Sequence, residues 1–153
     1  KKNPAIKKDI ELWENEYTTR PGQKYVNIEL TAEDSTQKLS DYVGKGHYVL
    51  VNFWTPWCPF SREEIPNLIK IFDEYKDKGL IMLGIACGNM KESKLVIDEF
   101  SIPYPQLFTC KSGVESLYGI DKFPEIILFS PDGTIVDRWL RGEALTTLLE
   151  RIL

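Results

Sequence analysis

The chain has 153 residues, of which 42% are hydrophobic and 27% charged, and its formal net charge is −4. These values are typical of one globular domain with a sizeable core. They offer no basic surface that would favour nucleic acid or an anionic membrane as a partner, and no apolar run is long enough for an integral membrane segment. The three cysteines are too few for a disulfide scaffold and lack zinc-ligand spacing, so we expect no metal and no cofactor.

The first half of the chain alternates helical and extended patterns. Apolar residues at helical spacing predict a helix from about Pro4 to Tyr17. Alternation predicts a strand at 25–30, followed by a polar turn at 31–36. A helical turn is expected at 39–46. The nearly continuous apolar run 48–54 predicts a buried parallel strand.

The second half continues with helices and strands in turn. A helix is expected from Cys58 to about Lys78, where Gly79 ends it. The remaining elements are predicted as strands at 80–86, 106–109, 126–130 and 134–139 and as helices at 92–100, 113–118 and 144–152. Strands that alternate with helices predict parallel pairing through right-handed crossovers, and the late hairpin adds antiparallel strands. The sequence therefore predicts a three-layer α/β sandwich.

The most specific motif is NFWTPWCPFSREEIP, from Asn52 to Pro66. An FW-x-x-W-C pattern after a buried strand, with E-x-P following, resembles the thioredoxin-like superfamily, and in particular the TlpA/ResA-type thiol–disulfide oxidoreductases (AhpC/TSA-redoxin-like). The segments PGQKYVNIEL and YGIDKFPEIILFSPDGTIVDRWLRG resemble the same branch. The resemblance implies a thioredoxin-like α/β/α sandwich with a central mixed sheet over 22–153, and it leaves 1–21 as a helical extension. It also implies that Pro124 is a cis proline facing the redox site.

The predicted site centres on Cys58, which lies where a strand turns into a helix. Unpaired backbone amides and the helix dipole stabilise a thiolate at such a position, and the thiolate is the species that attacks disulfides. An extended peptide would pair with the backbone of the residue before Pro124. The residues expected to bind substrate around the sulfur are Trp57, Pro59, Phe60, Phe123 and Pro124. A buried packing role for Cys58, Trp57 and Phe60 is the alternative.

The site departs from the family pattern at Ser61, which stands where the second cysteine of the dithiol pattern belongs. Serine cannot attack a mixed disulfide, although its hydroxyl can donate a hydrogen bond to the Cys58 thiolate. A natural one-thiol site and an engineered cysteine-to-serine change both fit the sequence. Glu64 matches a glutamate that tunes the cysteines in this branch, but acids also favour the first turns of a helix on their own account.

The other two cysteines, Cys87 and Cys110, each follow a predicted strand. If these strands are parallel neighbours, the two residues lie at the same edge of the sheet, and a disulfide between them is geometrically allowed. Two reduced thiols are the alternative. A disulfide would favour an oxidising compartment.

We therefore expect a thiol–disulfide oxidoreductase that forms mixed disulfides with protein or small-molecule thiols and disulfides through Cys58. One alternative is a redox-inactive binding module that retains the groove. Phe60 and Glu125 flank the groove and are expected to serve specificity in either case. Another alternative is a peroxiredoxin-like peroxidase: Thr55 is correctly spaced for it, but Val51 stands where that motif has proline. The resemblance implies a periplasmic or other extracytoplasmic location, with tethering through a removed N-terminal segment. The oligomeric state is left open.

Overall fold

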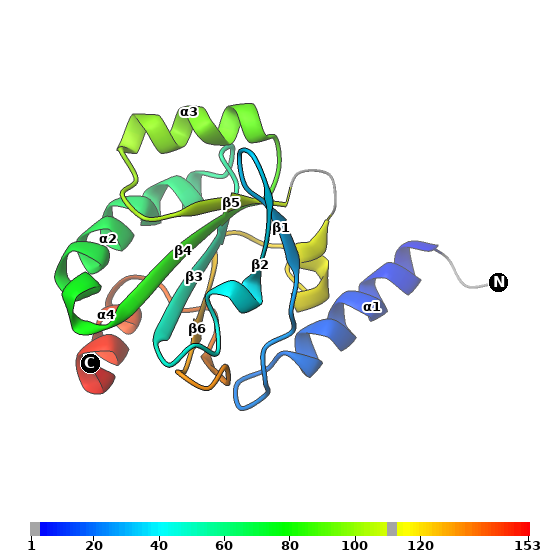
Figure 1. The fold of residues 1–153 in the computed structure, drawn as a ribbon. Helices are drawn as coiled ribbons and strands as arrows, with labels where there is room; N and C mark the ends of the chain where they lie inside the picture. The colour runs from blue at the N-terminus through cyan, green and yellow to red at the C-terminus, as the bar shows by residue number, and fades with distance from the viewer. Residues whose placement is uncertain (1–3, 110–112) are drawn as a thin grey trace.

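A computed structural model describes residues 4–109 and 113–153 of the chain (Figure 1). The strands are β1 (Glu29–Thr31), β2 (Thr36–Lys38), β3 (Tyr48–Trp54), β4 (Leu80–Ala86), β5 (Gln106–Phe108), β6 (Glu125–Phe129) and β7 (Ile135–Asp137). The α-helices are α1 (Pro4–Thr18), α2 (Pro59–Tyr75), α3 (Met90–Phe100) and α4 (Gly142–Ile152). Short 3-10 helices lie at η1 (Leu39–Asp41), η2 (Lys76–Lys78) and η3 (Val114–Tyr118).

The seven strands form one mixed sheet in the order β2-β1-β5-β4-β3-β6-β7. The β3–β4 and β4–β5 pairs are parallel, and the other pairs are antiparallel. The sheet therefore has a parallel centre with antiparallel additions at both sides. This arrangement confirms the predicted thioredoxin-like α/β class with a central mixed sheet.

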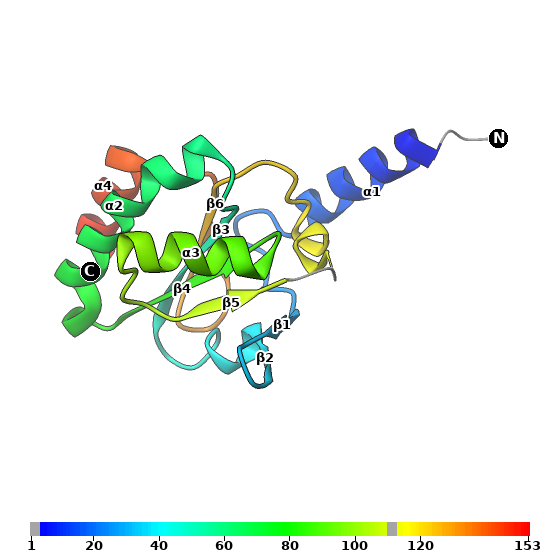
Figure 2. The ribbon, with the colours of Figure 1, turned by 90° about the horizontal axis from the view of Figure 1, so that it is seen from above.

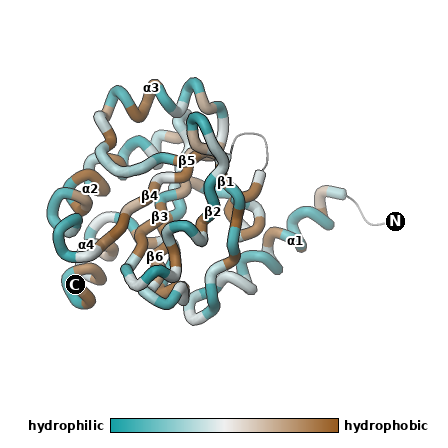
Figure 3. The backbone as a smooth tube through the Cα atoms, viewed as in Figure 1, coloured by the Kyte–Doolittle hydropathy of each residue, from teal (hydrophilic) through white to brown (hydrophobic). Residues whose placement is uncertain are grey.

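Hydrophobic residues from both faces of the sheet make the core, and the central strands are the most apolar part of the backbone trace (Figure 3). On one face, Leu50 and Met82 pack with buried residues of α2 and α4. On the other face, Val51 and Leu83 pack with Tyr118 of η3 and with residues from η1 and the segment before β1. Helices α2, α3 and α4 thus cover one face of the sheet, and η1, η3 and the segment before β1 cover the other.

The central elements match the sequence prediction because their patterns are strong. The buried strands at 48–54 and 80–86 have the predicted bounds. Helix α2 and η2 fill the predicted helix, and Gly79 ends it in the left-handed conformation with φ 88°. Helix α3 begins two residues before the predicted start, because the Asn89 side chain accepts a hydrogen bond from the Glu92 amide and caps the helix.

The N-terminal strands differ from the prediction. Strand β1 starts only at Glu29, and the unpredicted β2 pairs with it across a tight turn. The segment expected to begin this strand instead bonds to the opposite side of the sheet, where the Tyr25 amide donates to the Gly133 carbonyl. The chain then crosses the face of the sheet to reach β5. The apolar residues of this segment alternate with polar ones, as in a strand, because the apolar residues pack on that face of the sheet.

Helix α1 confirms the predicted N-terminal helix, but it buries none of its residues fully. It packs by its C-terminal half beside η3 and projects away from the body of the protein (Figures 1 and 2). It carries exposed apolar residues, among them Trp13 and Tyr17, whose rings stack. No helix in the described ranges is both long enough and apolar enough to cross a bilayer.

Candidate active site

Cys58 is the N-cap residue of α2, at the end of the loop that follows β3. Pro59 occupies the start of the helix, where the amide hydrogen that proline lacks has no intrahelical role. The Cys58 thiol is partly exposed and donates a hydrogen bond to the Phe123 carbonyl oxygen, with 3.5 Å between the atoms. This position places the sulfur near the unpaired amides and the positive end of the dipole at the start of α2.

The loop facing Cys58 has the geometry that the resemblance implied. The Phe123–Pro124 peptide bond is cis. Pairing between β6 and β3 begins at Glu125, opposite Phe53, so Phe123 lies just outside the sheet. Its backbone amide has no hydrogen-bond partner among the described residues. The residue whose carbonyl contacts the Cys58 sulfur therefore also carries this amide donor.

A cavity of about 400 Å³ opens over the cysteine, and its lining mixes aromatic rings with charged groups. Trp57 and Phe60 are 67% and 59% exposed, so the alternative that they are core residues is wrong. Pro59 is exposed as well but does not line this cavity. Sequence reasoning overlooked three members of the lining, although they lie within the family-like segment 118–142. The full lining is Trp57, Cys58, Phe60, Asp121, Lys122, Phe123 and Arg141.

Ser61 lies one turn into α2 and is completely buried. Its hydroxyl oxygen accepts a hydrogen bond from the Thr55 amide at 3.3 Å. No hydrogen bond joins Ser61 to Cys58 in the described part of the chain, so the expected donation to the sulfur is not formed here. Ser61 instead ties the loop before Cys58 to the first turn of α2.

Glu64 is also mostly buried, and its carboxylate serves the start of another helix. It accepts hydrogen bonds from the Gly142 amide at 2.9 Å and from the Asn67 side chain at 3.2 Å. Glu64 therefore satisfies an orphan amide at the N-terminus of α4 and joins that helix to α2. Its hydrogen bonds do not reach Cys58. The tuning role that the resemblance implied for Glu64 stays a prediction.

Glu125, expected at the groove surface, is instead fully buried behind it. Its carboxylate forms an ion pair with Arg138, which is itself 5% exposed. Burial raises the pKa of Glu125 to about 7, against the opposing effect of the Arg138 charge. The Arg138 guanidinium also donates to the Tyr118 carbonyl and the Thr19 hydroxyl, both at 2.7 Å. One buried ion pair thus joins the strand after Pro124 to η3 and the end of α1.

The other cysteines are set apart from Cys58. Cys87 is a buried free thiol beside the Ile85 carbonyl oxygen, and burial raises its pKa well above the usual value. A buried, protonated thiol is a poor nucleophile. Cys110 lies outside the described residues, so its disulfide with Cys87 stays a prediction.

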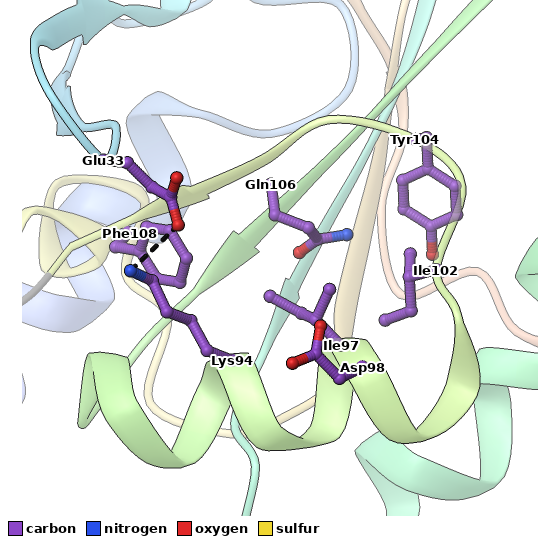
Figure 4. Close-up of a pocket in the computed structure, with 8 residues that line it drawn as sticks. All are labelled: Glu33, Lys94, Ile97, Asp98, Ile102, Tyr104, Gln106 and Phe108. Carbon is purple, nitrogen blue, oxygen red and sulfur yellow. Dashed lines mark ion pairs between the residues drawn. The ribbon is translucent and has the colours of Figure 1, made fainter.

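A cavity of similar size lies away from Cys58, between α3, β5 and the β1–β2 turn (Figure 4). An ion pair between Glu33 and Lys94 closes one end of it, with 2.9 Å between the charged atoms. Its lining includes the buried rings of Tyr104 and Phe108 but no cysteine. Within 4–109 and 113–153, no group of three or more His, Cys, Asp or Glu side chains gathers to hold a metal ion.

The fold and the site together have the thioredoxin-like architecture, in which a thiol at a helix start faces a cis proline. The chain belongs to the AhpC/TSA family, whose sequence model matches residues 21–138.

Similar proteins carry names of the same class. The thiol-disulfide oxidoreductase ResA of Oceanobacillus iheyensis is 33% identical over 75% of this chain, and that of Halalkalibacterium halodurans is 31% identical over 76%. The matches cover only 59% and 66% of those relatives. The thioredoxin domain of a Bacteroides vulgatus thiol-disulfide oxidoreductase superposes with a TM-score of 0.78 at 33% identity, covering 86% of this chain and 96% of the domain. A thiol:disulfide interchange protein from a Bacteroides species has a TM-score of 0.78 at 32% identity, covering 88% and 90%.

Proposed function

We propose that the protein is a one-thiol disulfide exchange enzyme that works through Cys58. The Cys58 thiolate attacks one sulfur of a substrate disulfide, forms a mixed disulfide with it and releases the other sulfur as a thiolate. A second thiolate from outside the protein then attacks the mixed disulfide. This step restores the Cys58 thiolate and leaves the substrate in a new disulfide, so the protein itself undergoes no net oxidation.

The observation that carries this proposal is the position of the Cys58 sulfur. It lies at the start of α2, beside the Phe123 carbonyl, under a cavity lined by the exposed rings of Trp57 and Phe60. Lys122 and Arg141 line the same cavity and, with the Asp121 carboxylate, place charged groups around the sulfur. Exposed aromatic rings around a partly exposed thiol are suited to holding a peptide against it.

Ser61 determines how the reaction ends. Its hydroxyl cannot replace the missing resolving thiol, and it is buried and bonded to the Thr55 amide. The mixed disulfide therefore persists until another thiol arrives. This behaviour suits exchange among protein or small-molecule thiols and disulfides better than rapid reduction. It does not depend on whether Ser61 is natural or introduced.

The extracytoplasmic location implied by the resemblance belongs to this proposal. Disulfides persist in oxidising compartments, and a one-thiol exchange protein needs disulfides to act on. Cell fractionation with an antibody to the protein tests it: the protein should appear in the periplasmic or membrane-associated fraction. Recovery in the cytoplasmic fraction alone would refute this part of the proposal.

The binding-module alternative has one observation in its favour, which is the absence of a second thiol at position 61. It requires only the groove and makes no use of the sulfur. It therefore predicts that peptide binding survives a Cys58→Ala substitution and that Cys58 exchanges no faster than an ordinary exposed thiol. The exchange enzyme instead requires that Cys58 exchange faster than an ordinary exposed thiol.

The deciding experiment is intact-mass analysis after exposure to oxidised glutathione. We expect one glutathionyl group per chain, removed by dithiothreitol and absent from the Cys58→Ala variant. Cys87→Ala is the matched control, because its buried thiol should contribute no adduct. If Cys58 takes up no glutathione, or takes it up no faster than a free cysteine peptide, the exchange function is refuted and the binding module is favoured.

A further inference from the structure

A second cavity, of about 340 Å³, adjoins the one over Cys58. The two cavities share Asp121 and Lys122, which lie in the loop that leads to Phe123. A ligand held over the cysteine can therefore continue into this second space. Its lining comes from α1, from the loop after η3 and from the residues after β7: Asp9, Leu12, Trp13, Glu16, Gly119, Asp121, Lys122 and Trp139.

Helix α1 forms a fixed wall of this cavity. At Gly119, which has φ 66°, a Cβ atom would lie 2.4 Å from the Leu12 carbonyl oxygen, so the helix touches the loop backbone directly. The buried Arg138 guanidinium holds the end of the helix through the Thr19 hydroxyl. The Asn15 side chain donates to the Ser116 carbonyl at 2.9 Å. The helical extension is thereby positioned against the active-site loop.

Trp139 lines the same cavity in an unusual conformation. Its backbone has φ 62°, which is rare and unfavourable for a bulky residue, and yet its side chain is 47% exposed. The neighbouring Arg138 and Leu140 are both buried and fix the backbone on either side. A large ring held at the surface in a strained conformation is typical of a binding role.

The cavity is also negatively charged. Three carboxylates line it, on Asp9, Glu16 and Asp121, against the single ammonium group of Lys122. Among the ion pairs that the described residues form, none involves any of these four. Two tryptophans and an excess of unpaired acids are the surroundings that a cationic side chain prefers.

We propose that this cavity is a specificity subsite for a lysine or arginine side chain of the protein substrate. This inference rests on the exchange function proposed above. An extended substrate segment places its cysteine over Cys58 and its basic residue between Trp13 and Trp139. Continuity with the cysteine cavity argues for a substrate segment as the occupant. The helical extension then contributes directly to substrate choice.

The test compares peptides that each carry one cysteine as a disulfide with thionitrobenzoate. In one series a single lysine moves one position at a time away from the cysteine, on either side, and a second series carries glutamate instead. The rate of thionitrobenzoate release is measured, and the rate of the Cys58→Ala variant is subtracted. We expect about fivefold faster exchange for lysine than for glutamate at the best position, declining as salt is added.

Two variants locate this preference. Asp9→Asn should reduce the lysine-to-glutamate ratio by about half, whereas Asp77→Asn should not change it. Asp77→Asn is the matched control, since it removes the same charge in η2, beyond the far end of α2 and roughly 28 Å from Cys58. Trp139→Gly removes the ring but suits the backbone, so it should lower the ratio without lowering thermal stability.

The outcomes separate this inference from the proposed function. Equal rates for the lysine and glutamate series, with normal uptake of glutathione, would refute the subsite and leave the exchange function standing. A preference that Asp77→Asn reduces as much as Asp9→Asn would also refute it, because net charge alone would then explain the effect. Failure of glutathione to modify Cys58 would refute the exchange function itself.

Discussion

The buried ion pair behind the active-site loop makes the sharpest prediction about stability. Replacing Arg138 with methionine keeps much of the side-chain volume but removes the charge. The change leaves the fully buried Glu125 carboxylate without its cation, and it also leaves the Thr19 hydroxyl and the Tyr118 carbonyl without their donor. Breaking one partner of a buried pair typically destabilises a protein by about 3–5 kcal/mol. In a domain of this size that loss lowers the Tm by roughly 10 °C.

The loss should also grow with pH. In the wild-type protein the pKa of Glu125 is raised from 4.5 to about 7, so folding takes up a proton between these values and stability falls as pH rises through that window. Arg138 is the group that opposes the rise. Without Arg138, the folded-state pKa of Glu125 lies above 7. Above the wild-type pKa, the free energy of unfolding of the variant therefore continues to fall by up to about 1.4 kcal/mol per pH unit, whereas that of the wild type has stopped falling.

Urea unfolding followed by tryptophan fluorescence, at about pH 6 and about pH 8.5, measures both effects. The Glu125→Gln/Arg138→Met double variant is the control, because it removes both charges. We expect it to be more stable than Arg138→Met alone at the higher pH. A single variant whose deficit is the same at both pH values, or a double variant no better than the single one, would refute the assignment of Glu125 as the titrating group.

Further substitutions test the contacts that hold the site together. Gly119→Ala should release α1 and lower the Tm by several degrees more than Gly22→Ala, since a Cβ at Gly22 meets no atom within 4 Å; equal losses would contradict the close contact. Ser61→Ala should cost about 1–3 kcal/mol in urea unfolding, because the Thr55 amide loses its buried acceptor. Glu64→Ala should cost about 1 kcal/mol by exposing the start of α4, and an unchanged midpoint would show that its hydrogen bonds contribute nothing.

The sequence predicted the parts of the molecule whose signals are local. The apolar runs of β3 and β4 are typical of buried strands in a parallel sheet, and their predicted bounds agree with the structure to the residue. Cys58 and Pro124 were brought together by resemblance, since no local pattern places residues so far apart side by side. In the structure the two residues lie close together, because the Cys58 thiol contacts the carbonyl of Phe123, the residue before Pro124.

The features that sequence reasoning missed depend on distant partners. Glu125 is expected beside the groove because it follows Pro124 in the sequence, and only the fold brings Arg138 against it in the interior. The three-residue strands β1 and β2 are too short for their alternation to be distinguished from a turn. The exposed position of Trp139 depends on its positive φ angle, and a tryptophan in a sequence does not indicate such a conformation.

The most direct test of the account is the fate of the mixed disulfide after excess glutathione is removed. The wild-type adduct on Cys58 should persist until a thiol is added. In the Ser61→Cys variant the adduct should release glutathione and leave an internal disulfide, because residues three apart at a helix start lie within disulfide reach. Spontaneous loss of the adduct from the wild-type protein would contradict the claim that this site forms but cannot resolve its intermediate.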